Sequence, residues 1–410
     1  MKVLIVGAGI GGLTAALSLH AAGVRAVVID SAIELRPLGV GINLLPHATG
    51  ELAELGLQER LAEIAIPTAE CLHLDRFGNE IWREPRGLAA GHPWPQYSVH
   101  RGELQMLLLN AVYERIGPAA VRTGMRFENA TQNADGVRVR IHDRIRDRIV
   151  EMRADAVIGA DGLHSAVRAQ LQPGEGPPLW NGIRMWRGVS EARPFLSGAS
   201  MVIAGSNHAA KFVAYPISAA ARQRGRALIN WVAEVKVTDM AEQIPDWNRT
   251  GRLEDVLPHY RGWQFDGQDV GELMAASDTI LEYPMVDRNP LTSWTYGRIT
   301  VLGDAAHPMY PVGSNGGSQA IVDARVLARE LAARSDAVAG LEAYEAARRE
   351  VVNAIVLANR DMPVDHILRK VADRAPHGFD RIEEVLTECE LDEIGKGYQH
   401  TSRKATPIHQ

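Results

Sequence analysis

The sequence predicts an α/β fold in which a parallel-sheet domain is interrupted by an antiparallel sheet and followed by C-terminal helices. A strand–helix–strand unit opens the chain within residues 3–30. Residues 180–235 alternate between apolar and polar side chains, with turn residues between the runs, which is typical of an antiparallel sheet. A buried-strand pattern returns at 298–304, and helical spacing follows over 316–334 and 340–372. The parallel-sheet domain is therefore discontinuous in sequence.

The first unit has the pattern of a Rossmann-like dinucleotide-binding motif. Residues 3–6, VLIV, predict a buried strand, residues 12–22 a helix, and residues 26–30, AVVID, a second strand. The sequence between the first strand and the helix is GAGIGG. In this GxGxxG pattern Gly7 permits a tight turn, Gly9 lets the backbone approach a pyrophosphate, and Gly12 permits close packing of helix on strand.

Asp30 ends the second strand, where a carboxylate can accept hydrogen bonds from the hydroxyls of an adenosine ribose. This use disfavours a 2′-phosphate at the same place, so the bound nucleotide is not expected to be NADP. Further along, residues 101–116 predict a helix, and alternation on both sides of the Asp135-Gly136 turn predicts a hairpin.

Two later segments place acidic residues directly after strands. In 155-DAVIGADGLHSAVR-168 the strand delivers Asp161, although an Asp-Gly turn with a helix cap explains the same residues equally well. In 297-GRITVLGDAAHPMYPVGSNGGSQAIVDA-324 the strand delivers Asp304, which can hold sugar-like hydroxyls. The backbone that follows, with Gly313, Asn315 and Gly316, opens a helix and can donate N–H groups to an anion such as a reduced flavin.

Together these three segments resemble the group A flavoprotein monooxygenases, the family of p-hydroxybenzoate hydroxylase and salicylate hydroxylase. The resemblance covers roughly residues 1–360 and implies an FAD-binding domain of the glutathione-reductase type. It implies that the glycine segment binds the ADP part of FAD and that Arg101 lies near the pyrophosphate. It also implies that Asp161 contacts FAD and shapes the approach of NAD(P)H, and that Asp304 binds the ribityl chain.

The resemblance divides the chain into six segments. FAD-binding parts are expected at 1–70, 101–175 and 286–360, a substrate domain at 71–100 and 176–285, and a C-terminal helical segment at 361–410. Within the family, five segments are most similar to members that hydroxylate phenazines: 36-RPLGVGIN-43, 185-MWRGV-189, 214-AYPIS-218, 246-DWNRTGRLEDVLP-258 and 283-YPMVDRNPL-291.

The activity that the resemblance implies is hydroxylation of an aromatic or heteroaromatic small molecule, such as a phenazine, a quinolone or a salicylate. Non-covalent FAD would take hydride from NADH or NADPH and react with O2 to a C4a-hydroperoxide. No second GxGxxG occurs, so NAD(P)H is expected to bind only transiently. Two alternatives stay open: a flavin reductase or oxidase on the same scaffold, and a non-enzymatic escort protein of the same fold.

Three residues are candidates for a base that deprotonates the ring: His47, Tyr215 and His307. For each of them a packed, purely structural role is the simpler alternative. Four residues of the antiparallel sheet and one of the glycine-rich loop are candidates for a flat apolar substrate slot. They are Met185, Trp186, Tyr215, Trp231 and Pro311.

Composition narrows the partners. The net charge of -6 gives no reason to expect nucleic acid or an anionic membrane, and no apolar run is long enough to span a bilayer. The two cysteines, Cys71 and Cys389, have no metal-like spacing, so we expect no metal and a reducing, cytoplasmic location. A monomer or a homodimer is expected.

Overall fold

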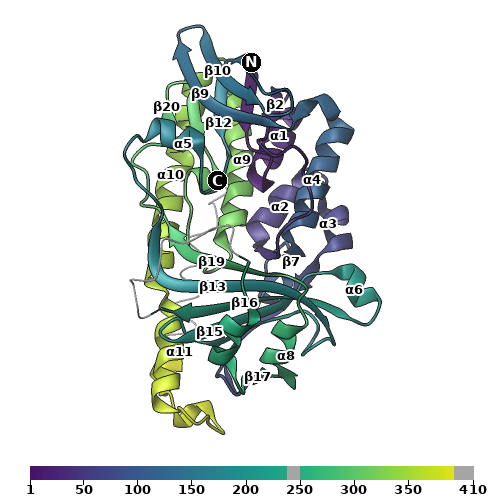
Figure 1. Cartoon of the computed structure of the whole chain (residues 1–410), viewed down its shortest axis with the longest axis vertical. Coiled ribbons are helices and arrows are strands. Elements are labelled where there is room, and N and C mark those ends of the chain that lie inside the picture. Colours follow the sequence, from purple (N-terminus) through teal and green to yellow (C-terminus); the bar gives the residue numbers. More distant parts are fainter. Residues whose placement is uncertain (238–249, 392–410) are drawn as a thin grey trace.

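A computed structural model describes residues 1–237 and 250–391 of the chain. Residues 246–249 of the phenazine-type segment 246–258 lie outside the described residues, as does the end of the expected C-terminal helical segment, 392–410. Figure 1 shows two layers of sheet in one elongated molecule, with the N-terminal strands and helices in its upper half and a broad second sheet below them.

The upper sheet has six strands and confirms the predicted parallel domain. Its order is β20-β21-β12-β1-β2-β8, parallel throughout except that the short edge strand β20 runs antiparallel to β21. The central strands β1 and β12 are buried along almost their whole length, because helices such as α1 (Ile10–Ala21) and α5 (Ala166–Leu171) and the three-stranded sheet of residues 125–154 pack against them. The strands are β1 (Lys2–Val6), β2 (Arg25–Ile29), β8 (Val121–Arg122), β12 (Ala156–Gly159), β20 (Thr295–Tyr296) and β21 (Ile299–Val301).

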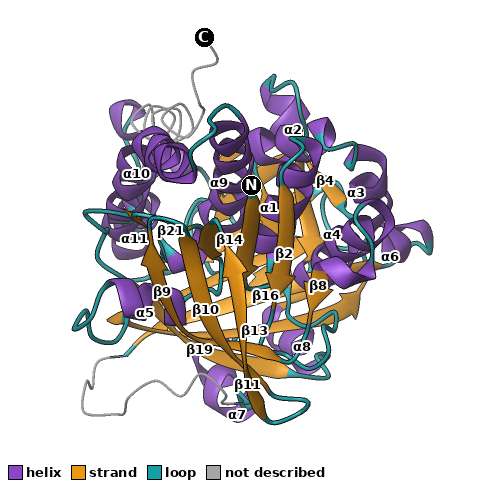
Figure 2. Cartoon of the chain, turned by 90° about the horizontal axis from the view of Figure 1, so that it is seen from above, coloured by secondary structure: helices purple, strands orange, loops and turns teal. Residues whose placement is uncertain are grey.

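Helices from both ends of the chain pack against this sheet, and α1 lies between α4 and α9 (Figure 2). The helices of this half are α1 (Ile10–Ala21), α2 (Pro46–Glu54), α3 (Gln58–Ile64), α4 (Arg101–Arg115), α5 (Ala166–Leu171), α9 (Asn315–Ala332) and α10 (Ala337–Asp361). The expected hairpin gains a third strand, which gives β9 (Met125–Asn133), β10 (Gly136–Asp143) and β11 (Arg148–Ala154).

The lower sheet confirms the inserted antiparallel sheet. Its order is β19-β13-β16-β15-β14-β5-β6, and only β14 and β5 pair in parallel. The strands are β5 (Glu70–Leu74), β6 (Glu80–Pro85), β13 (Leu179–Ala192), β14 (Ser200–Gly205), β15 (Ala210–Pro216), β16 (Ala227–Lys236) and β19 (Ile280–Asp287). Because β5 and β6 enter the sheet beside β14, the sheet joins two parts of the chain that are far apart in sequence.

Short elements complete the described residues. A small sheet of β3 (Gly41–Leu44), β7 (Gln96–His100) and β4 (Ile66–Thr68) lies between the two halves, and β17 (Gln264–Phe265) pairs with β18 (Gln268–Asp269). The remaining helices are α6 (Ala219–Gln223), α7 (Leu253–Val256), α8 (Val270–Ala275) and α11 (Pro363–Arg374). Among the described helices, none combines the length and the apolar character that crossing a bilayer requires.

The seven-stranded sheet has two different faces, because side chains alternate along each strand. One face packs on α7 and α8, and we call it the helix face; it carries Trp186, Phe212 and Trp231. The opposite face packs on the loop that follows β21, and we call it the loop face. It carries Met185, Val213, Tyr215 and Val232, in one apolar cluster with Tyr310 of that loop.

Helix α11 is attached to the lower sheet through a buried charge cluster. The Lys211 ammonium on β15 lies 3.1 Å from Asp365 on α11 and 3.8 Å from Glu234 on β16. The backbone N–H of Asn207 donates to the other oxygen of Asp365 at 3.0 Å. Burial by itself would lower the pKa of Lys211, but the two carboxylates outweigh it and raise that pKa, so the lysine stays charged.

We expect Lys211→Met to destabilise the protein by about 3–5 kcal/mol, because the substitution leaves two carboxylates buried without their cation. The free energy of unfolding in urea, measured on the flavin-loaded chain, checks this. Arg60→Met is the control, since it removes a pair with Glu114 that is exposed and worth at most about 1 kcal/mol. Equal losses in both variants would contradict a stabilising role of the buried cluster.

Candidate functional site

The glycine loop after β1 is shaped by contacts that only glycine permits. A Cβ on Gly12 would lie 1.9 Å from the carbonyl oxygen of Gly7, so helix α1 packs directly on the turn before it. Gly7 has a φ of +108°, and a Cβ there would meet the Ala160 carbonyl at 2.3 Å. A Cβ on Gly9, in contrast, would have no atom within 4 Å. The loop is therefore closed against protein at two glycines and open at the third, which suits the approach of a ligand.

Asp30 and Gln105 hold this loop from two sides. The Asp30 carboxylate accepts hydrogen bonds from the backbone N–H groups of Ala8, at 2.7 Å, and Ala32, at 2.8 Å. The side-chain amide of Gln105 on α4 donates to the Ala8 carbonyl at 2.8 Å. Sequence reasoning did not single out Gln105, although it stands one helical turn after Arg101 and therefore on the same side of α4.

Arg101 begins helix α4 and is exposed. Its backbone N–H donates to the Val40 carbonyl at 2.9 Å, and its side chain lies alongside Gly39. Within residues 1–237 and 250–391 it makes no ion pair. An exposed, unpaired guanidinium on the helix that carries Gln105 to the glycine loop is suited to bind a phosphate.

Asp161 is engaged in capping helix α5. Its carboxylate accepts from the Ser165 hydroxyl at 2.5 Å and from the Ala166 backbone N–H at 2.7 Å. Burial raises the pKa of Asp161 above its usual value, although these hydrogen bonds oppose the shift. The contacts favour the helix-cap interpretation of this motif. The Asp161 backbone nevertheless lies beside Gly7, so the segment does adjoin the glycine loop.

Arg168 fixes the segment that carries Asp304. Its guanidinium is buried, pairs with Glu175, and donates to the carbonyls of Ala305 at 3.1 Å and Ala306 at 2.7 Å. The donors of Arg168 are thus used within the protein. Arg168 thereby connects the segment 155–168 to the segment 297–324.

Asp304 lies exposed in the short helical turn after β21, at the N-terminal end of α9. A Cβ on Gly316 would lie 3.9 Å from its carboxylate oxygen. The preceding loop reverses through two left-handed residues, Gly313 with a φ of +67° and Ser314 with a φ of +60°. Asn315 is buried as the first residue of α9. The structure thus brings Asp304, Gly313, Asn315 and Gly316 together at the positive end of an 18-residue helix.

His307 does not face a substrate. It is buried beside Trp294, and its Nε2 lies 2.5 Å from the carboxylate of Asp323 in the middle of α9. That carboxylate also accepts from Arg348 of α10, at 2.9 Å. The prediction of His307 as a base is therefore corrected, because a buried charge cluster already uses its ring.

His47 lies at the start of α2, half-buried against α9, with its Nε2 3.3 Å from the side-chain nitrogen of Gln319. Burial lowers the pKa of His47 to about 4, and the charges of Arg348 and His92 add to the effect. The ordinary pKa of a histidine is about 6.5, so this lowering makes His47 a much weaker base than a free imidazole. His47 is neutral at pH 7.

The predicted substrate residues separate onto the two faces of the seven-stranded sheet. Met185 and Tyr215 lie on the loop face, and Pro311 is exposed in the loop beneath them. Trp186 and Trp231 belong to the helix-face core instead, and the indole N–H of Trp231 donates to the Ser277 hydroxyl at 2.8 Å. We correct the prediction for both tryptophans, because strand alternation turns them away from the cofactor half.

Arg187 is a polar group on the loop face that sequence reasoning missed. It donates to the Gly41 carbonyl at 2.8 Å and is hydrogen-bonded to the side chain of Tyr215. Burial raises the pKa of Tyr215, although Arg187 opposes the shift. The side-chain oxygen of Asn230 accepts from the Gly41 N–H at 2.7 Å. Strand β3, in the small sheet between the two halves, is thereby hydrogen-bonded to the loop face of the lower sheet.

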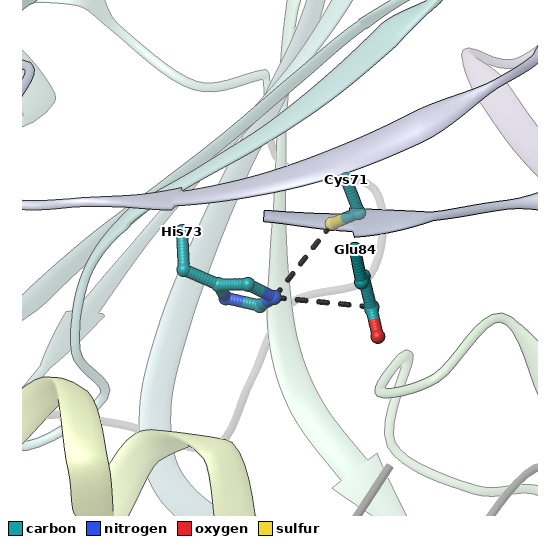
Figure 3. A group of neighbouring side chains, drawn as sticks. All are labelled: Cys71, His73 and Glu84. Carbon is teal, nitrogen blue, oxygen red and sulfur yellow. Dashed lines mark hydrogen bonds and ion pairs between the residues drawn. The ribbon is translucent and has the colours of Figure 1, made fainter. Parts of the chain in front are cut away.

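One group of potential metal ligands lies in the lower sheet. Cys71 and His73 on β5 and Glu84 on β6 are buried, and Figure 3 shows the His73 ring pointing toward the other two. The Nε2 of His73 lies 3.8 Å from the Cys71 sulfur and 4.0 Å from a Glu84 oxygen. However, Arg86 pairs with Glu84. Burial, Arg86 and Lys211 lower the pKa of His73 to about 3. Two fixed cations beside the group disfavour a divalent cation.

Comparisons with known proteins agree with this geometry. A family model described as FAD binding domain matches residues 1–359. Phenazine 1,6-dicarboxylic acid hydroxylase PhzS of Lysobacter antibioticus is 52% identical over 91% of both chains. Aurachin C monooxygenase/isomerase of Stigmatella aurantiaca is 32% identical over 87% of both chains. The crystal structure of Klebsiella pneumoniae HpxO with FAD and uric acid matches 99% of this chain and 96% of its own, with a TM-score of 0.78 and 26% identity.

We expect Gly9→Val to yield a folded protein that has lost most of its FAD, because its Cβ would enter the open space at the loop, with no protein atom within 4 Å of it. Absorbance of the released flavin per chain, with far-UV circular dichroism for the fold, checks this. Gly12→Val is the matched comparison and should fail to fold, since its Cβ would overlap the Gly7 carbonyl. A folded Gly9→Val protein with full flavin content would exclude the loop as the binding site.

Proposed function

The chain belongs to the FAD binding domain family, and from this membership we propose that it is an FAD-dependent monooxygenase that hydroxylates a phenazine carrying a carboxylate. The observation that carries the proposal is the 52% identity to phenazine 1,6-dicarboxylic acid hydroxylase over 91% of both chains. Other relatives act on different rings: 3-hydroxybenzoate 6-hydroxylase 1 of Aquipseudomonas alcaligenes is 31% identical over 85% of this chain. Both relatives are named as hydroxylases of aromatic molecules, which supports an aromatic substrate. The choice of a phenazine rests on the phenazine hydroxylase of Lysobacter antibioticus alone.

The residues of the upper half fit FAD. The open space at Gly9, the N-terminus of α1 and the unpaired Arg101 suit a pyrophosphate, and Asp30 suits the ribose. Asp304 and the N-terminus of α9 would hold the other end, where a positive helix end favours an anionic ring. When bound, FAD accepts hydride from NADH or NADPH and activates dioxygen. We propose no covalent link, because no histidine or cysteine stands beside the flavin segments in an attachment motif.

The loop face of the seven-stranded sheet would bind the ring. Met185, Val213 and Val232 make it apolar, which suits a flat aromatic molecule and excludes water from it. Tyr215 and Arg187 add two polar groups that can orient a substituent on the ring. In this proposal the ring lies between the sheet and the loop 310–313, near the N-terminus of α9. The division into FAD-binding segments 1–70, 101–175 and 286–360 and substrate segments 71–100 and 176–285 remains part of the proposal.

A cytoplasmic location and a monomeric or homodimeric state remain part of the proposal. Cys71 is buried and Cys389 exposed, and both are free thiols, which suits a reducing compartment. The second candidate, an oxidase or reductase on the same scaffold, differs in the fate of dioxygen. That difference gives the decisive test.

We expect the purified chain to consume NADH or NADPH in the presence of a phenazine carboxylate and to insert one oxygen atom into it. Under labelled dioxygen, mass spectrometry of the product should show one labelled atom, with salicylate and a quinolone as comparison substrates. Peroxide is measured in parallel. If the label appears only in peroxide or water for every substrate, the oxidase or reductase interpretation replaces the hydroxylase.

We expect Tyr215→Phe to keep its FAD and to form about fivefold less hydroxylated product per NAD(P)H consumed, since one orienting hydrogen bond is worth roughly 1 kcal/mol. The ratio of product to peroxide measures this. Tyr260→Phe is the control: this tyrosine lies on the helix face and donates to the backbone carbonyls of Lys211 and Glu234. It should lower stability and leave the product ratio unchanged, and equal ratios in both variants would remove Tyr215 from the substrate site.

A further inference from the structure

A buried chain of polar side chains connects α10 to the start of α2. The Arg348 guanidinium on α10 donates to the Gln319 side-chain oxygen on α9 at 2.5 Å. The Gln319 nitrogen in turn lies 3.3 Å from His47 Nε2 and 3.4 Å from the Asn315 side-chain oxygen. Gln319 is therefore in contact with both His47 and the first residue of α9, where the cofactor is expected.

The chemistry of arginine sets the direction of every hydrogen bond in this chain. A guanidinium has only donors, so the group that Gln319 turns toward Arg348 must be its oxygen. Its NH2 group must then point toward His47. Because an amide NH2 only donates, His47 Nε2 has to accept and cannot carry a proton. The ring proton of a neutral His47 is therefore on Nδ1.

Arg348 is held so that it cannot turn away. It is 4% exposed, and its Nε donates to Asp323 at 2.9 Å. Asp323 is fully buried and accepts also from the Gly303 N–H at 3.1 Å and from His307. A buried ion pair with hydrogen bonds on every side has one geometry. The fixed guanidinium of Arg348 therefore also fixes the orientation of the Gln319 amide.

The surroundings of His47 reinforce the neutral state. Arg348 and His92 are the charged or titratable groups that act on it, and both disfavour a second ring proton, as burial does most strongly. Protonation of Nε2 would also place an N–H against the NH2 group of Gln319. Within the described part of the chain, Nδ1 has no hydrogen-bond partner, and the ring is only half-buried.

We propose that Arg348 and Gln319 are positioning residues that hold His47 as the neutral Nδ1–H tautomer, so that His47 offers the substrate a hydrogen-bond donor. The matching group on the substrate is an acceptor: a carboxylate, a phenolate or a ring nitrogen. This inference rests on the proposed function for the substrate ring and for its place beside His47. It assigns His47 to orientation of the substrate, and it replaces the hypothesis that His47 removes a proton.

The tautomer is tested without substrate, on the FAD-loaded full chain labelled with 15N-histidine. Two-bond 1H–15N spectra distinguish the protonated from the unprotonated ring nitrogen, and His47→Asn identifies the His47 signals. The expected result is Nδ1–H with an unprotonated Nε2 that does not titrate at pH 6–8. A protonated Nε2, or a His47 that titrates near its ordinary pKa of about 6.5, would overturn the proposal.

Gln319→Glu tests the relay with an almost isosteric change. A carboxylate at this position pairs with Arg348 and can only accept, so His47 must turn an Nε2–H toward it. We expect the tautomer to switch and the pKa of His47 to rise. Arg349→Gln is the matched control, because Arg349 is the neighbouring arginine on α10 and pairs with Glu345 of its own helix. An unchanged tautomer in Gln319→Glu, or a switch in the control, would contradict the relay.

Two substitutions of His47 distinguish a role as hydrogen-bond donor from a role as catalytic base. The amide of His47→Asn can place an N–H near the position of Nδ1 but cannot take a proton, whereas His47→Leu does neither. A donor role predicts that His47→Asn keeps most of the kcat/KM and that His47→Leu loses about tenfold, as expected for one hydrogen bond to a charged group. Equal losses in the two variants would overturn the donor role. Failure of both variants and the parent to hydroxylate any phenazine would refute the proposed substrate and leave the tautomer measurements standing.

Discussion

The carboxylate of Asp323 is the contact on which the arrangement of the cofactor half depends. From the middle of α9 it accepts from the Gly303 backbone, from Arg348 on α10 and from His307. Burial alone would raise the pKa of Asp323, but His307 and Arg348 outweigh it and lower that pKa, so the group is ionised. Because an ionised carboxylate in a protein interior needs all its partners, three segments of the chain are fixed relative to one another.

This constraint reaches the cofactor site through short connections. Gly303 precedes Asp304, so the anchored backbone determines where the Asp304 carboxylate stands. Arg168 holds the next two carbonyls from the other side. The positions of Asp304 and of the α9 N-terminus are thus set by buried charges behind them, while the exposed residues themselves remain available to a ligand. Rigid support behind an open site is what a bound cofactor requires for orientation.

The seven-stranded sheet contributes a different constraint, because each strand presents its odd and even residues to different surroundings. Met185 faces the loop after β21, and its neighbour Trp186 enters the core under α7 and α8. Tyr215 and Trp231 separate in the same manner, although their strands are paired. Both faces carry mainly apolar side chains, so composition alone does not tell which face a given residue lies on.

By itself, the sequence determined the order of layers, the glycine loop and the acidic residues at the ends of strands. These features are local: the turn at Gly7, the packing of Gly12 and the strand before Asp304 each depend on a few consecutive residues. The sequence also indicated the family, since its motifs occur together in one order. The periodicity of apolar residues was sufficient to predict the fold, and the structure confirms it.

Only the tertiary structure decided which candidate side chains face the site. Trp186 differs from Met185 by one residue, and only the pairing of β13 with its neighbours assigns each to a face. The side-chain partner of His47, Gln319, lies 272 residues further along the chain. His307 is buried against Asp323 of α9, 16 residues away. Gln319 and Arg348, which determine the proton of His47, carry no local motif. Burial and long-range hydrogen bonds set their chemistry, and both exist only once the chain has folded.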